Sequence, residues 1–138
     1  MSEYDQVPFI DVGIAENPEP RCPCVLILDT SSSMGGRKME QLNAGLRAFA
    51  EDLKTDAMAS KRVEVAMIGF GPVQVLSNFE TADTFNPPQL EAYGDTPMGA
   101  AIAEAARMIA DRKAVLRANG NNPYRPWAFL ITDGAPTD

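Results

Sequence analysis

Residues 26–34, LILDTSSSM, place a run of apolar side chains directly before an aspartate and four consecutive hydroxyl residues. The first four of these residues belong to a longer apolar run, CVLILD at 24–29. This run has the length of a strand but does not alternate apolar and polar residues. A strand without that alternation is usually covered on both faces, as in a parallel sheet. We therefore predict a central strand that opens onto a loop of oxygen-bearing side chains.

The segments that follow predict a helix and then a hairpin of two strands. After SSSMGGR, apolar residues recur at spacings of three and four and predict a long amphipathic helix: Met39, Leu42, Leu46, Phe49 and Leu53. Residues 62–71 and 73–79 are predicted strands, and the Gly71-Pro72 turn between them is so short that they must pair antiparallel. Residues 80–95 show no period and are predicted to form a loop.

A second long helix and a last strand complete the predicted elements. Pro97 is tolerated in a first helical turn, and it is followed by a stripe that we expect to be buried: Met98, Ile102, Ala105, Ile109 and Leu116. Residues 127–134, WAFLITDG, are predicted to form an apolar strand in which Trp127 packs against the core. This order predicts an α/β sandwich, with a mostly parallel sheet, one antiparallel hairpin strand and helices on both faces.

The composition restricts the classes of function. The 138 residues fit one domain, predicted to span 21–138 after an N-terminal arm at 1–20 that contains three prolines. A net charge of −7 without a basic cluster argues against nucleic acid as a partner, and no apolar run is long enough to span a membrane. The absence of histidine excludes Ser-His-Asp and Cys-His catalysis and zinc sites that need imidazole.

The N-terminal residues and the two cysteines bear on the cellular compartment. The first ten residues contain no lysine, no arginine and no apolar run of signal-peptide length, so we predict a cytoplasmic protein. Cys22 and Cys24 form a C-x-C without a second pair, and residues two apart on a strand point the same way. We expect both thiols to pack against one face, with a redox or metal role as the alternative.

Five oxygen-bearing side chains carry the predicted chemistry: Asp29, Ser31, Ser33, Thr96 and Asp133. Asp29 and Asp133 lie at the ends of two predicted strands, and ligand-binding groups of open α/β sheets gather beyond the carboxyl ends of the strands. We expect the two carboxylates to meet there. Such oxygens suit a hard divalent cation, here Mg²⁺ with Mn²⁺ or Ca²⁺ as alternatives. Neutral hydroxyl ligands would leave the ion able to take a carboxylate from a partner protein.

Three segments, DTSSS (29–33), DTPMG (95–99) and LITDG (130–134), resemble the parts of the metal-ion-dependent adhesion site (MIDAS) of von Willebrand factor A (vWA) domains. The resemblance extends over residues 21–138 and implies a Rossmann-like vWA sandwich. Family members continue past the last of these segments with further strands and helices, so it also implies a domain truncated after its fourth strand.

The resemblance also implies roles for the five side chains. The hydroxyls of Ser31, Ser33 and Thr96 would bind the metal directly, while Asp29 and Asp133 would coordinate it or support the other ligands. Residues 85–105, FNPPQLEAYGDTPMGAAIAEA, are most similar to bacterial TerY-type proteins, which are associated with tellurium resistance and stress-response gene clusters. The implied function is a non-enzymatic, metal-dependent protein-binding module that acts as an intracellular adaptor.

Other interpretations of the same residues stay open at this level. Ser33 is also a possible cap of the helix that begins near Arg37, and Asp95 is interpreted as a loop residue or helix cap. An Mg²⁺-dependent phosphatase or hydrolase with Asp29 as nucleophile is the alternative function, although Ser31 stands where a D-x-D phosphotransferase would have its second aspartate. We also expect residues 127–132 to form an exposed edge strand that drives homodimer formation.

Overall fold

Strand β1, Cys22–Asp29, is an inner strand of a four-stranded sheet with the order β3-β2-β1-β4. The computed structural model describes Ile14 and residues 16–133, so most of the predicted N-terminal arm lies outside the described residues. Strand β1 pairs in parallel with β2, Val63–Phe70, and with β4, Trp127–Ile131. Strand β3, Gln74–Thr81, pairs antiparallel with β2. The predicted α/β fold with one antiparallel hairpin strand is confirmed.

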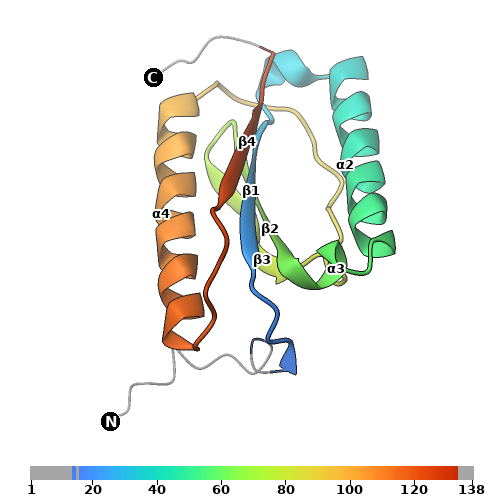
Figure 1. The fold of residues 1–138 in the computed structure, drawn as a ribbon. Helices are drawn as coiled ribbons and strands as arrows, with labels where there is room; N and C mark the ends of the chain where they lie inside the picture. Colours follow the sequence, from blue (N-terminus) through green and yellow to red (C-terminus); the bar gives the residue numbers. More distant parts are fainter. Residues whose placement is uncertain (1–13, 15, 134–138) are drawn as a thin grey trace.

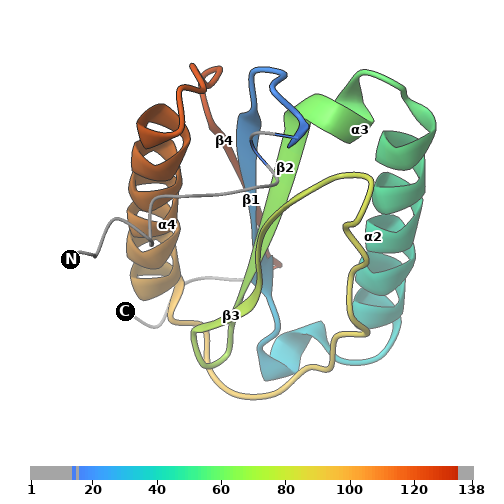
Figure 2. The same ribbon diagram turned by 90° about the horizontal axis from the view of Figure 1, so that it is seen from below.

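Two long helices cover opposite faces of the sheet (Figures 1 and 2), namely α2, Arg37–Thr55, and α4, Met98–Ala118. A 3₁₀ helix η2, Ser32–Met34, lies between β1 and α2, and a short helix α3, Ala59–Arg62, lies between α2 and β2. Alternate residues of β1 pack under different helices. Leu26 and Leu28 join the cluster under α2, while Val25 and Ile27 join the cluster under α4. Both faces of β1 are buried, which is why its sequence shows no polar alternation.

The buried face of α4 differs by about one position from the predicted stripe. Ala101, Ala105 and Met108 pack against the sheet, whereas Ile102 is 46% exposed. The prediction that Ile102 belongs to the core is therefore wrong. Alanine side chains are short, so this face lets the helix backbone lie close to the strands. The bulkier isoleucine face would hold the helix farther from the sheet.

Strand β4 forms one edge of the sheet, and all five of its residues are exposed in the described part of the chain. Trp127 is 57% exposed and stacks on Phe129 with ring centroids 6.0 Å apart, so the prediction that Trp127 packs against the core is wrong. An apolar groove of about 770 Å³ lies between β4 and α2. The predicted exposed edge strand is thus confirmed for these residues.

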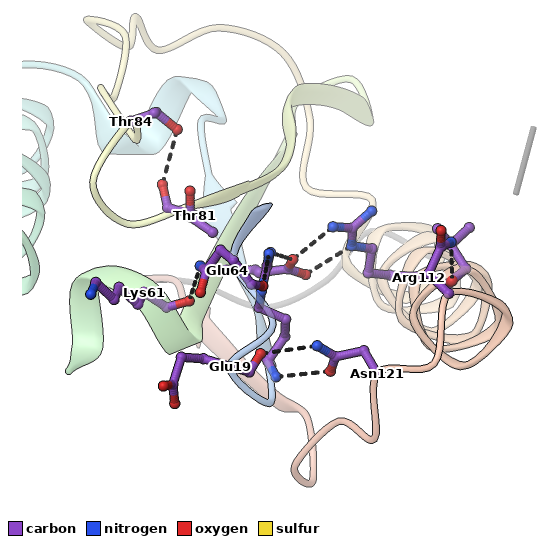
Figure 3. A network of polar contacts seen from close by, with 11 residues as sticks. Glu19, Lys61, Glu64, Thr81, Thr84, Arg112 and Asn121 are labelled. Atoms are coloured by element: carbon purple, nitrogen blue, oxygen red, sulfur yellow. Dashed lines mark hydrogen bonds and ion pairs between the residues drawn. The ribbon is translucent and has the colours of Figure 1, made fainter. Parts of the chain in front are cut away.

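A buried network of charges holds the other end of the sheet, where β1 and β2 begin (Figure 3). The fully buried carboxylate of Glu64 accepts hydrogen bonds from Arg21 before β1, at 2.7 Å, and from Arg112 on α4, at 2.7 and 2.8 Å. Asn121 Oδ1 accepts a hydrogen bond from the backbone N–H of Arg21, and Asn121 Nδ2 donates one to the backbone carbonyl oxygen of Glu19. A buried carboxylate is stable only when it is paired and hydrogen bonded, and these contacts connect α4 to both strands.

We predict that Glu64→Gln lowers the free energy of unfolding by about 3 kcal/mol or more, because it removes the charge shared by the buried guanidinium group of Arg21 and the half-buried one of Arg112. Urea denaturation followed by circular dichroism measures the loss. Glu104→Gln is the control, since Glu104 pairs with Arg107 on the exposed face of α4 and should move the midpoint little. Equal midpoints for the two variants would contradict the assigned role of Glu64.

Candidate metal centre

Four of the five predicted site residues meet at the carboxyl ends of β1 and β4. Asp29 is the last residue of β1, Ser31 and Ser33 follow in the loop that forms η2, and Asp133 lies two residues beyond β4. Because β1 and β4 are parallel neighbours, their carboxyl ends share one edge of the sheet. The expectation that the two carboxylates approach each other follows from this pairing.

A continuous chain of polar contacts links these four residues. Asp29 Oδ1 accepts a hydrogen bond from the backbone N–H of Ser31 at 2.9 Å and from its hydroxyl at 2.5 Å. The hydroxyl oxygens of Ser31 and Ser33 are 3.2 Å apart, and the Ser33 hydroxyl donates to Asp133 Oδ1 at 3.0 Å. Two carboxylates are thus bridged by two hydroxyl groups.

Burial changes along this chain from the sheet to the surface. Asp29 is fully buried and Ser31 is 2% exposed, whereas Ser33 is exposed. The second oxygen of Asp29, Oδ2, accepts a hydrogen bond from the hydroxyl of Thr132 at 2.6 Å. Asp29 is therefore held on both oxygens, and the group opens to solvent on the side of Ser33 and Asp133.

The loop that carries Thr96 lies against the serine loop, but the hydroxyl of Thr96 is not part of this chain of polar contacts. Gly94 O accepts hydrogen bonds from the backbone N–H of Ser32 at 3.0 Å and from its hydroxyl at 3.1 Å, and Tyr93 N–H donates to Thr30 O at 2.7 Å. Among the described residues, the Thr96 hydroxyl makes no hydrogen bond with the other four side chains. Its loop is brought to the site by backbone contacts two and three residues earlier.

Gly94 allows its own loop to lie close to the turn between β2 and β3. Its φ of +85° is rare for residues with a side chain, and a Cβ there would lie 1.9 Å from the carbonyl oxygen of Gly71. In the sequence, YGDTP at residues 93–97 predicts only a loop. The glycine in it was the available sign of a close backbone approach.

Lys38 is a further charged residue at the site that sequence reasoning missed. Its Nζ lies 2.5 Å from Asp133 Oδ2, although the two residues are 95 positions apart. The hydrogen bond from Lys38, and to a smaller degree that from Ser33, holds the pKa of Asp133 below its usual value. Position in the sequence gave no sign of this contact.

The alternative role of Ser33 as a helix cap is wrong. Helix α2 begins after Gly36, which makes no side-chain capping hydrogen bond, and Ser33 is directed to Asp133 instead. Asp95 is exposed in the loop, in keeping with the solvated interpretation.

The two cysteines lie away from this site. Cys24 is buried, Cys22 is half-buried, and both are free thiols. Burial raises the pKa of Cys24 to about 12, so its thiol stays protonated. The expected packed thiols are confirmed for Cys24 and only partly for Cys22.

The donor set fits a hard divalent cation. Hydroxyl and carboxylate oxygens are the ligands that Mg²⁺, Mn²⁺ and Ca²⁺ prefer. Asp133 already pairs with one positive charge, the ammonium group of Lys38. Residues 14 and 16–133 contain no group of three or more His, Cys, Asp and Glu side chains that could hold a metal. A site here would depend on the serine and threonine hydroxyls.

Comparisons with known proteins agree with the fold. A family model described as von Willebrand factor type A domain matches residues 24–135. No curated protein matches the chain. Within the described residues, no helix is long and apolar enough to cross a membrane.

Several solved structures resemble this chain. The vWF domain of the type V pili tip protein Mfa5 from Porphyromonas gingivalis is 20% identical with a TM-score of 0.64, over 85% of this chain and 39% of that one. The pilus adhesin SpaC from Lactobacillus rhamnosus GG, in its open conformation, is 20% identical with a TM-score of 0.68, over 86% and 15%. The ArnB paralog VWA2 from Sulfolobus acidocaldarius is 17% identical with a TM-score of 0.60, over 86% and 29%. The chain spans less than half the length of each.

We predict that Gly94→Ala destabilises the protein by more than about 1 kcal/mol, because the added Cβ collides with Gly71 and φ is unfavourable. Gly45→Ala is the matched control. Gly45 lies in α2 with open space around its Cβ, so alanine there should stabilise by about 0.5–1 kcal/mol. Thermal denaturation of both variants tests the pair, and a Gly94→Ala protein as stable as Gly45→Ala would contradict the close loop contact.

Proposed function

The chain belongs to the von Willebrand factor type A domain family, and from this premise we propose that it is a metal-ion-dependent protein-binding module. The observation that supports the metal dependence is the chain of polar contacts from Asp29 through Ser31 and Ser33 to Asp133. It gathers neutral hydroxyls and two carboxylates at one rim of the sheet. Neutral hydroxyls as the direct ligands would bind a hard cation without neutralising its charge.

In this proposal Ser31, Ser33 and Thr96 bind a divalent ion, Mg²⁺ with Mn²⁺ or Ca²⁺ as alternatives. When bound, the ion supplies a positive charge with a coordination position open to a carboxylate of the partner protein. Asp29 would support the ligands without binding the ion directly, because its two buried oxygens already accept hydrogen bonds from Ser31 and Thr132. It would orient the Ser31 hydroxyl and leave the outer side of the site for the partner.

The same observation disfavours the alternative phosphatase or hydrolase. A nucleophilic Asp29 would need one carboxylate oxygen directed at the substrate. Asp29 is fully buried, and each of its oxygens already accepts at least one hydrogen bond. Binding without turnover is the function that this geometry favours.

We also propose a subfamily and a cellular role for this chain. The similarity of residues 85–105 to TerY-type proteins supports an adaptor in a bacterial tellurium-resistance or stress-response system, in the cytoplasm. The net charge of −7 disfavours long-range attraction of an acidic partner, so capture would depend on the local field of the ion.

We further propose that β4 pairs with β4 of a second copy. Antiparallel pairing centred on Phe129 would place Trp127 opposite Ile131 of the other copy, so that apolar residues of one face meet. The exposure of all five β4 residues supports this pairing. Light scattering at high protein concentration should give the mass of a dimer, and Phe129→Lys should give a monomer. A monodisperse wild-type monomer would contradict the homodimer.

We predict that the wild-type protein binds Mg²⁺ in calorimetry and that the double variant Ser31→Ala/Ser33→Ala does not, because it loses two of the proposed ligands. Ser32→Ala is the matched control, since it removes a hydroxyl of the same loop that donates to Gly94 O. It should keep metal binding. Mg²⁺ binding by the double variant equal to that of the wild type would contradict the proposed ligand set.

A further inference from the structure

The ammonium group of Lys38 contacts the candidate metal centre from outside the proposed set of ligands. Lys38 lies in the first turn of α2, and its Nζ is 2.5 Å from Asp133 Oδ2. The other carboxylate oxygen, Oδ1, accepts the hydrogen bond of the Ser33 hydroxyl. Asp133 is thus held on one oxygen by a cation and on the other by a hydroxyl that belongs to the site.

The formal charges of the site make this lysine significant. Asp29 receives its hydrogen bonds from neutral groups of Ser31 and Thr132. Within the part of the chain that the structure describes, Lys38 is the cationic side chain that pairs with one of the two carboxylates, that of Asp133. It balances half of their formal charge of −2.

A divalent ion and an ammonium group cannot both lie against the same carboxylate without repulsion. Two like charges a few ångströms apart oppose each other even where water screens them. An ion bound beside Ser33 and Asp133 would therefore meet the charge of Lys38 directly.

Lys38 is also free to leave. Its side chain is 55% exposed, whereas that of Asp133 is 17% exposed. A lysine ammonium on a flexible four-carbon stem can turn into solvent without disturbing the core. Exposed ion pairs contribute little to stability, so the contact can be exchanged for a metal ion.

We propose that Lys38 is an internal counter-ion that competes with the divalent cation for Asp133. The lysine holds Asp133 and Ser33 in place in the metal-free protein and releases the carboxylate when the ion binds. It thereby sets the metal affinity of the site without being a ligand. This inference rests on the proposed metal-binding function.

The test compares Lys38→Met with Arg37→Met by calorimetry with Mg²⁺ alone and by electron paramagnetic resonance with Mn²⁺ alone. Arg37 is the preceding, exposed residue, and among the described residues it makes no hydrogen bond or ion pair with Asp133, so its variant changes the net charge equally. Lys38→Met should tighten metal binding about fivefold or more, and Arg37→Met less than about twofold. Lys38→Arg, which keeps the charge, should bind as the wild type does.

The outcomes separate this inference from the function on which it rests. If the wild type binds Mg²⁺ and Lys38→Met binds it equally or more weakly, the counter-ion role is overturned and the metal site stands. Equal tightening by Lys38→Met and Arg37→Met would reveal a general charge effect and would also overturn it. If Lys38→Met binds Mg²⁺ and neither the wild type nor Arg37→Met does, the result would support the counter-ion role of Lys38. If none of the proteins binds either metal, the proposed function and the inference both fail.

Discussion

The buried carboxylate of Asp29 is the constraint on which this end of the molecule depends. A carboxylate without exposure to water is costly unless donors surround it. Three donors do so here: the backbone N–H and the hydroxyl of Ser31, and the hydroxyl of Thr132. The first two fix the loop after β1, and the third attaches the segment after β4 to it. The buried carboxylate of Asp29 thus holds the loop after β1 and the segment after β4 together.

The charges at the two ends of the sheet serve different purposes because their burial differs. Glu64 is fully buried between two guanidinium groups, and exchange of these partners would require opening the fold. Asp133 is partly exposed and pairs with the exposed side chain of a lysine. The first arrangement stabilises the fold, whereas the second leaves a carboxylate that can change its partner. Only the second is suited to reversible binding.

Local sequence patterns predict the fold well. Strand β1 follows from its unbroken apolar run, the β2–β3 hairpin from the short turn at Gly71-Pro72, and helix α2 from its stripe. The convergence of Asp29, Ser31, Ser33 and Asp133 follows from parallel pairing, which places strand ends at one edge. The errors at Ile102 and Trp127 arose because periodicity does not say which neighbouring face of a helix packs, or whether a strand is covered.

The contacts that complete the site could not be read from the sequence. Thr132 and Lys38 reach partners 103 and 95 positions away, and nothing in their local surroundings marks them. The role of Gly94 depends on the backbone of a loop that packs against it from another part of the chain. Such contacts are decided by tertiary packing, so they become visible only when the elements are assembled.

The most direct test of the account is anomalous diffraction from crystals of the protein soaked in Mn²⁺. The account predicts one strong anomalous peak at coordination distance from the hydroxyl oxygens of Ser31, Ser33 and Thr96, with Asp29 behind it and the Lys38 ammonium turned away from Asp133. A map without a peak at this rim, or with Lys38 still on Asp133 and the manganese bound elsewhere, would contradict it.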